Sequence, residues 1–184
     1  MAKILLINPS KWGRGITPIW IASHSALLKS KNHEVHLFDS TFYKDWSIDE
    51  LSFNTSNEQY KPSKYSKYIN LIEGDIVTDL QNKIDAYMPD IIFWSAISSH
   101  IHGEGEYVNI QYGYELIDKV RSDSLIITAG LQATARPKEM FDFFPKVDCF
   151  IGGESEVVLC QVADEFPKMD NILSLNGLVF KDKG

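Results

Sequence analysis

The chain alternates between short, almost continuously apolar runs and longer segments in which apolar residues recur every three or four positions. Short apolar runs are typical of strands that are buried on both faces, whereas the longer period is that of an amphipathic helix. The alternation predicts βα units around a parallel sheet. The predicted strands are Lys3–Asn8, Glu34–Asp39, Asp90–Ser95, Leu125–Ala129 and Cys149–Gly152.

Helices are predicted between these strands and after the last one. Pro18 and Pro137 suit the first turn of a helix, because proline lacks the N–H that such a position leaves unpaired. The predicted helices are Pro18–Lys31, Ile69–Tyr87, Gly113–Ser122, Pro137–Phe144 and Ser155–Phe166. The terminal segment LNGLVFKDKG predicts a short extra strand. The pattern is that of a doubly wound α/β domain, for which 2-1-3-4-5 is a common strand order.

Residues 41–68 interrupt this rhythm, because they are polar and aromatic with weak periodicity. Within them we predict a short helix near Ser47–Leu51 and otherwise loop. A connection of this length is typically functional or an excursion over the surface. The abrupt charged end, KDKG, predicts that the chain is a fragment of a longer protein.

Composition narrows the class of protein. At 184 residues with 44% hydrophobic residues, the chain fits one domain, 1–184, and its net charge of -7 does not favour nucleic acid or an anionic membrane as a partner. The apolar run at the N-terminus is far shorter than the roughly 20 residues of a membrane span and does not read as a signal peptide, so we expect a cytoplasmic protein. The two cysteines, Cys149 and Cys160, lack the spacing of a redox pair or a zinc site and are interpreted as reduced thiols.

In a doubly wound sheet, ligands bind outside the carboxyl ends of the strands, where the strand order reverses. The loops predicted there are rich in Gly, Ser, Ala and Thr, which allow close approach to the backbone and supply hydrogen bonds. Any one of them alone would be ordinary turn chemistry, but four at one edge favour a ligand site. They are Asn8–Thr17, Ala96–Val108, Gly130–Arg136 and Gly153–Glu156.

The sequences of these loops do not match the motifs of several familiar α/β functions. A dinucleotide fingerprint needs a third glycine, but Gly13 and Gly15 are followed by Pro18 at that place, and no Gly-Lys-Ser/Thr triplet marks a P-loop. A phospho-receiver domain needs acidic residues where Asn8 and Ser95 stand. No Ser-His-Asp or Cys-His set can be placed, so a hydrolase is the weakest reading.

Histidines offer few ligand sites. His24 lies on a predicted helix, where a structural or exposed role is expected. In HIHGEGE, His100 and His102 alternate with Glu104 and Glu106, a pattern that suits a divalent metal. A solvated loop explains the same segment better, because no third ligand is fixed by spacing.

Charged residues near the edge have two readings each. Lys11, Arg14 and Arg136 are suited to meeting a phosphate, or are surface charges. Asp39 stands where a dinucleotide fold binds a ribose, and is equally suited to a turn or cap.

Two stretches carry a specific resemblance. KILLINPSKWGRGITPIWIASHSALLKSKNHEVHLFDS resembles the opening of the N-terminal cobalamin-binding domain of cobalamin-dependent radical SAM enzymes, with its LL-x-NP strand, Gly/Pro loop and HEV segment. GLQATARPKEMFDFFPKVDCFIGGESE resembles the later turn, the Val-Asp strand and the Gly-Glu-Gly-Glu signature of that family. The resemblance covers nearly the whole chain except residues 41–68.

The resemblance implies a flavodoxin-like (Rossmann-like) fold that binds cobalamin, with the nucleotide tail against the sheet and the corrin ring over the carboxyl edge. Trp12 would pack on the lower face of the ring, and Ser95 or Ser98 would bond the tail. The cofactor-binding residues implied are Asn8, Ser10, Trp12, Gly13, Ser95, Ser98, Ala129, Gly130, Gln132, Gly152, Gly153 and Glu154.

Related domains carry Asp-x-His-x-x-Gly in the first loop, whose histidine ligates cobalt. Laid on NPSKWG, that pattern puts Asn8 at the Asp, Ser10 at the His and Gly13 at the Gly. Neither Asn nor Ser is a usual cobalt ligand. The resemblance therefore implies binding without a protein histidine below cobalt, which suits repeated methyl transfer.

Radical SAM chemistry requires Cys-x-x-x-Cys-x-x-Cys for its cluster, and this sequence of two cysteines does not contain it. The resemblance thus implies a module whose [4Fe-4S] cluster and S-adenosylmethionine would belong to a downstream radical SAM domain of a methyltransferase-type enzyme. One alternative is a standalone cobalamin binder, and another is a flavodoxin-like sensor or docking module without cobalamin.

Overall fold

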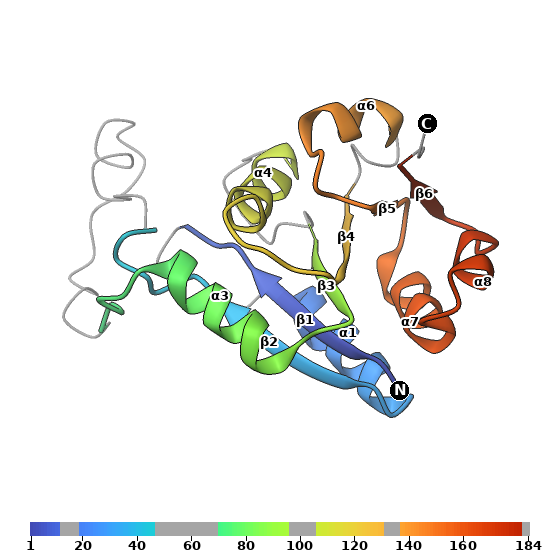
Figure 1. Cartoon of the computed structure of the whole chain (residues 1–184), viewed down its shortest axis with the longest axis horizontal. Helices are drawn as coiled ribbons and strands as arrows, with labels where there is room; N and C mark the ends of the chain where they lie inside the picture. The colour runs from blue at the N-terminus through green and yellow to red at the C-terminus, as the bar shows by residue number, and fades with distance from the viewer. Residues whose placement is uncertain (12–18, 47–69, 96–105, 131–136, 182–184) are drawn as a thin grey trace.

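A six-stranded sheet forms the centre of the computed structural model (Figure 1). Its strands are β1 (Lys3–Asn8), β2 (Glu34–Asp39), β3 (Ile91–Ser95), β4 (Leu125–Ala129), β5 (Cys149–Ile151) and β6 (Leu178–Phe180). Their order is β2-β1-β3-β4-β5-β6, and only β6 runs antiparallel to its neighbour. The flavodoxin-like order 2-1-3-4-5 and the extra C-terminal strand are therefore confirmed.

The structure describes residues 1–11, 19–46, 70–95, 106–130 and 137–181, with only the backbone for 106–109 and 137. The insertion predicted at 41–68 lies mostly outside these ranges, as does the helix predicted near Ser47–Leu51. Its first residues form turns, and Tyr43 makes an isolated parallel bridge with Ile72.

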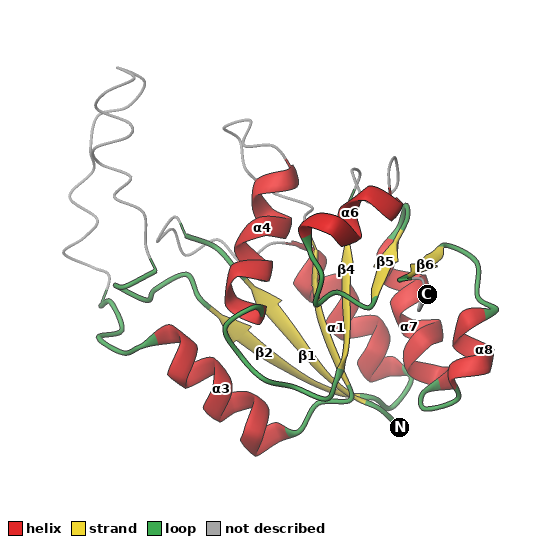
Figure 2. Cartoon of the chain, turned by 45° about the horizontal axis from the view of Figure 1, so that its top comes forward, coloured by secondary structure: helices red, strands yellow, loops and turns green. Residues whose placement is uncertain are grey.

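Helices cover both faces of the sheet (Figures 1 and 2). The helices are α1 (Ile19–Ser30), α3 (Ile76–Tyr87), α4 (Glu106–Ile117), α6 (Pro137–Phe143), α7 (Ser155–Glu165) and α8 (Met169–Leu173). One hydrophobic cluster joins α3, α4 and α6 to the sheet, and another joins α1, α7 and α8 to it. The short α8 was not predicted.

Strand β1 shows why the sequence reads as almost continuously apolar. Leu5 and Ile7 belong to the cluster under α3 and α4, whereas Ile4 and Leu6 belong to the cluster under α1 and α7. All four side chains are fully buried. A strand covered on both faces has no polar face to alternate with the apolar one.

The predicted helix Gly113–Ser122 is wrong in its bounds, because α4 runs from Glu106 to Ile117. Gly113 lies inside the helix, where a Cβ would stand 2.3 Å from Nε1 of Trp94. The glycine is thus needed for close packing and does not mark the start of the helix. At the other end, Lys146 Nζ donates to the carbonyls of Ile117, Asp118 and Val120 and caps the last turn.

The predicted helix Ile69–Tyr87 begins too early, since α3 starts at Ile76. Asp75 is its N-cap, and the side chain accepts a hydrogen bond from the Thr78 N–H at 2.6 Å. Just before it, Ile72 is held by the bridge to Tyr43 and so is not free to join the helix. Among the described helices, none combines the length and the apolar character that a membrane crossing requires.

Candidate functional site

The carboxyl ends of β3, β4 and β5 carry small residues in adjacent positions. Ser95 pairs with Ala129, and Ala129 pairs with Ile151, so the three strands end at nearly the same level. Ser95, Ala129 and the following Gly130 are buried. After β5, Gly152 is half-buried and Gly153 is exposed. The small size of these residues suits an edge at which a ligand approaches the backbone closely.

Gly153 has a backbone conformation that favours glycine. Its φ is +75°, in the left-handed region, and a Cβ added there would meet nothing within 4 Å. The next residue, Glu154, is exposed and serves as the N-cap of α7 without a side-chain hydrogen bond to the helix. The positive φ therefore favours glycine at this position, and the described residues leave open space beside it.

Asn8 and Asp39 form a polar cluster where β1 and β2 end. The buried amide of Asn8 donates to Asp39 Oδ1 at 3.0 Å and to the Thr41 hydroxyl at 3.2 Å. The same carboxylate oxygen accepts the backbone N–H of Thr41 at 3.0 Å, which is an Asx turn. Of the two readings of Asp39, the structure supports the turn residue. The Asp-Ser-Thr sequence at the strand end was the available signal for this cluster.

Ser10 lies beside this cluster and is held through its backbone. Ser40, which is fully buried, donates through its hydroxyl to the Asn8 carbonyl at 2.8 Å and to the Ser10 carbonyl at 3.0 Å. The backbone N–H of Ser40 also donates to the Asn8 carbonyl. The segment that leaves β1 is thus tied to the segment that leaves β2.

His24 has the structural role that was one of its two readings. It is fully buried in α1, its Nδ1 donates to the Trp20 carbonyl at 2.7 Å, and its Nε2 accepts from the Ser155 hydroxyl at 2.9 Å. The ring stacks on Phe93 with centroids 5.1 Å apart. Burial lowers the pKa of His24 below its ordinary value of 6.5, although the Trp20 carbonyl and the Glu156 carboxylate oppose that shift. The neutral ring links α1 to the first residue of α7.

Lys11 lies against α4 and does not stand free for a phosphate. Its Nζ is 2.5 Å from Glu115 Oε2, 4.0 Å from the centroid of the Trp46 ring and 4.4 Å from that of Tyr112. Its side chain is 15% exposed. Of the two readings of this lysine, neither a phosphate contact nor a free surface charge describes it.

Several predicted site residues lie outside the described residues. They are Trp12, Gly13, Ser98 and Gln132, together with the charged and metal-ligand candidates Arg14, His100, His102, Glu104 and Arg136. Of Glu106 only the backbone is described, as the first residue of α4. For these residues the expectations drawn from the sequence stay predictions.

One group of possible metal ligands lies away from the carboxyl edge. Nε2 of His33 is 3.0 Å from Asp164 Oδ1, and the thiol of Cys160 is close to both. However, Nδ1 of His33 faces the backbone N–H of Ala2 at 3.2 Å and must accept from it. Nε2 therefore carries the proton and donates to Asp164, so it has no lone pair for a metal.

The two cysteines are free thiols, as predicted, and both are buried. Burial raises the pKa of Cys149 to about 12 and also raises the pKa of Cys160. Neither thiol is therefore a ready thiolate.

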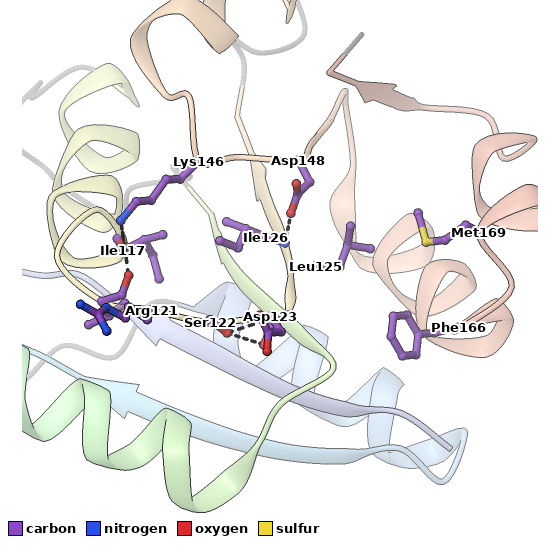
Figure 3. Close-up of a pocket in the computed structure, with 12 residues that line it drawn as sticks. Ile117, Arg121, Ser122, Asp123, Leu125, Ile126, Lys146, Asp148, Phe166 and Met169 are labelled. Carbon is purple, nitrogen blue, oxygen red and sulfur yellow. Dashed lines mark hydrogen bonds between the residues drawn. The ribbon is translucent and has the colours of Figure 1, made fainter. Parts of the chain in front are cut away.

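A groove of about 690 Å³ lies at the opposite, amino edge of the sheet (Figure 3). It is bounded by the start of β4, by Asp148 before β5, and by Phe166 and Met169 near α8. Its polar groups are largely used within the chain: Asp148 accepts the N–H of Ile126 at 2.9 Å, and Lys146 caps α4. This groove is therefore poorly equipped to recognise a polar ligand.

The structure resembles parts of larger enzymes. No model of a known protein family matches the chain, and no curated protein matches it in sequence. Two structures of the radical S-adenosylmethionine methyltransferase TsrM from Kitasatospora setae match at 17% identity, one with tryptophan substrate and a SAM analogue bound and one with cobalamin and a [4Fe-4S] cluster bound. Their TM-scores are 0.66 and 0.65, and the match covers 100% of this chain but 29% and 28% of theirs.

A third similar structure is that of OxsB, a cobalamin-dependent S-adenosylmethionine radical enzyme with aqua-cobalamin bound. It matches with a TM-score of 0.56 at 16% identity, over 100% of this chain and 21% of that one. The chain thus spans less than a third of the length of these enzymes. At such identities the likeness is one of fold.

Proposed function

We propose that this chain is a cobalamin-binding module. The observation that carries the proposal is the row of small residues at the carboxyl ends of β3, β4 and β5, in a sheet whose fold is shared with the enzymes TsrM and OxsB. A large planar cofactor with a nucleotide tail needs an edge where side chains do not block the backbone. The small residues in the described part of this edge suit that requirement.

The described residues that would hold the cofactor supply space and hydrogen bonds. Ser95 has a hydroxyl at the end of β3, and Gly130, Gly152 and Gly153 follow the next two strands of the sheet, β4 and β5. The described residues assigned to this role are Ser95, Ala129, Gly130, Gly152, Gly153 and Glu154. Trp12, Gly13, Ser98 and Gln132 are proposed with them from the resemblance in sequence.

The first loop is proposed to leave the lower face of cobalt without a histidine from the protein. Asn8 stands at the place of the Asp in Asp-x-His-x-x-Gly, and its side-chain amide already donates to Asp39 and Thr41. Ser10 stands at the place of the histidine and has no nitrogen in its side chain. When bound, cobalamin would supply a cobalt centre that can carry a methyl group.

The chain is further proposed to serve a methyltransferase-type radical SAM enzyme. Its fold corresponds to less than a third of the TsrM chain, and the TsrM structures contain a [4Fe-4S] cluster or a SAM analogue. We propose that a partner domain holds the cluster and S-adenosylmethionine. In this arrangement the present chain binds and orients the cobalamin, and the partner domain performs the radical chemistry.

Retention of hydroxocobalamin tests the binding proposal. The 184-residue chain is mixed with hydroxocobalamin and desalted, and its visible spectrum is recorded. We expect about one cobalamin per chain, whereas loss of the chromophore would favour a sensor or docking module. A matched variant is Gly153→Asn, because asparagine tolerates a positive φ but adds a side chain to the open edge. We expect it to fold normally and retain less cobalamin.

The absence of a histidine ligand is tested separately. Cobalamin bound to protein labelled with ¹⁵N-histidine is chemically reduced to the paramagnetic Co(II) state and compared by EPR with the same form bound to unlabelled protein. We expect identical nitrogen splittings, since no histidine would ligate cobalt. A splitting that changes with the label would refute this part of the proposal while leaving cobalamin binding intact.

A further inference from the structure

Lys11 connects three segments that are distant in the sequence. It follows β1 by three residues, its ion-pair partner Glu115 and the Tyr112 ring lie on α4, and Trp46 lies after β2. The ammonium group sits between two aromatic rings, at 4.0 and 4.4 Å from their centroids. The side chain of this loop lysine is therefore held at its tip.

Lysine side chains are usually mobile and solvated, so a lysine held in this way is unusual. A lysine side chain has four rotatable bonds and a strongly hydrated charge, so ordering and partly burying it costs free energy. Here the cost is offset by the Glu115 carboxylate and by the attraction between the cation and the ring faces. An exposed pair such as Lys44 and Glu73, with side chains 60% and 74% exposed, has no comparable surroundings.

The surroundings of Trp46 indicate independently that its ring face is there to bind the Lys11 ammonium group. It is 7% exposed, yet its indole Nε1 has no hydrogen-bond partner within the described parts of the chain. A buried N–H without an acceptor is unfavourable, and phenylalanine would avoid that penalty. Tryptophan has the ring face that attracts a cation most strongly, and the Lys11 ammonium lies over this ring.

These contacts restrict the backbone at Ser10. Its carbonyl accepts from Ser40, and the next residue is anchored to α4 by the Lys11 side chain. Backbone between two such anchors has little freedom. The backbone from Pro9 to Lys11, which is the described start of the first loop, is therefore fixed at the carboxyl edge.

We propose that Lys11 is a positioning residue, which holds Ser10 and the start of the first loop in place for cofactor binding through its contacts with Glu115, Trp46 and Tyr112. This inference rests on the proposed function, because the bound group is taken to be cobalamin. Lys11 itself does not contact the cofactor in this proposal, since its charge is paired with Glu115. Its effect is transmitted through the backbone.

The test compares Lys11→Met with Lys11→Arg in the 184-residue chain. Methionine keeps an unbranched side chain but removes the charge, whereas arginine keeps the charge and the capacity to lie against aromatic rings. Lys119→Met is the matched control, because Lys119 Nζ lies 6.0 Å from the same Trp46 ring but is not part of the first loop. Two quantities are measured: ¹⁵N order parameters of Ser10 and Lys11, and the dissociation constant for hydroxocobalamin.

In the native chain we expect order parameters of about 0.85 at both positions, falling below about 0.6 in Lys11→Met. We expect the same variant to bind hydroxocobalamin about tenfold more weakly. Lys11→Arg should restore most of both quantities, and Lys119→Met should change neither.

Three results would overturn the inference. They are unchanged order parameters in Lys11→Met, a loosened loop with unchanged affinity, and a Lys11→Arg variant as impaired as Lys11→Met. If the native chain binds no hydroxocobalamin, the proposed function fails and the positioning role fails with it. The order parameters would still decide whether Lys11 holds the loop.

Discussion

The hydrophobic cluster under α3, α4 and α6 is richer in aromatic side chains than the cluster under α1, α7 and α8, and we call the two the aromatic layer and the aliphatic layer. The buried aromatic residues of the first cluster are Phe38, Tyr43, Trp46, Tyr87, Trp94, Phe141, Phe144 and Phe150, and those of the second are Trp20 and Phe93. Large rings fill space with few residues but carry polar atoms and need matching gaps. The aliphatic layer instead contains a buried histidine.

The two layers therefore depend on different local devices. In the aromatic layer, Gly113 makes room for Trp94, whose Nε1 donates to the Ile110 carbonyl at 3.2 Å. In the aliphatic layer, both nitrogens of His24 are paired with groups of α1 and α7. The contact of Gly113 depends on side-chain volume, whereas the contacts of His24 depend on hydrogen bonding and protonation. Substitutions at the two positions can measure these contributions separately.

The largest effect is expected from Gly113→Ala. A Cβ at this position would stand 2.3 to 2.7 Å from atoms of the buried Trp94 ring, so the ring or the helix must shift. Overpacking of this kind lowers the free energy of unfolding by about 1–3 kcal/mol, measured by urea denaturation. Gly74→Ala is the control, because its closest contact is the tip of the Asp79 side chain. Equal stability of the two variants would contradict the packing role of Gly113.

His24→Leu should have the next largest effect, in the aliphatic layer. It leaves the buried hydroxyl of Ser155 without its acceptor, a loss of about 1–3 kcal/mol of unfolding free energy. In the double variant His24→Leu with Ser155→Ala, no unpaired hydroxyl remains. We expect the double variant to be less destabilised than the sum of the single variants. Strict additivity in urea denaturation would show that the two groups are not coupled.

Acid should weaken the aliphatic layer through His24. Its folded-state pKa is lowered below the unfolded value of 6.5, so below that value the unfolded state binds more protons than the folded state. The stabilising contribution is thus present above pH 6.5 and is lost as the pH falls through the folded-state pKa. The groups that face the ring include Ser23, Ser155 and Glu156.

Urea denaturation between pH 7.5 and pH 5 measures this loss, and His24→Leu is the reference because it removes the titrating ring. We expect the native chain to lose more stability over this interval than the variant does. Parallel profiles would assign the acid sensitivity to other groups.

The smallest effect is expected from Tyr43→Phe, in the aromatic layer. The Tyr43 hydroxyl donates to Asp79 at 3.0 Å, and burial together with this contact raises its pKa to about 12. Removing the hydroxyl should lower the unfolding free energy by about 0.5–1.5 kcal/mol while the ring packing stays. Thermal melts of Tyr43→Phe and Gly113→Ala would compare their losses of stability. A larger loss in Tyr43→Phe would show that this hydrogen bond contributes more to the stability of the layer than the close packing at Gly113 does.

The strands could be predicted closely from the sequence. β1, β2 and β4 have the predicted bounds, and β3 and β5 differ by one residue. Their apolar runs are a direct consequence of burial on both faces, which is visible without knowing the neighbours. The start of α4 was misplaced because glycine is unfavourable inside a helix, and only the position of Trp94 explains why Gly113 lies there.

The candidate site was predicted in outline. The sequence places Ser95, Ala129 and Gly152 at strand ends, and the structure brings their strands side by side in register. The contacts of Lys11 and His24 could not be predicted, because each joins segments more than one hundred residues apart. No local pattern marks such partners.

The sequence by itself determined the parallel sheet, the two-sided burial of its strands and the small residues that follow them, because these features depend on each segment's own hydrophobic period and backbone requirements. The tertiary structure decided which polar side chains remain at the carboxyl edge. Asn8 and Lys11 had candidate roles toward a ligand, yet Asn8 is engaged by Asp39 and Lys11 by Glu115. Pairing of this kind depends on the packing of distant elements.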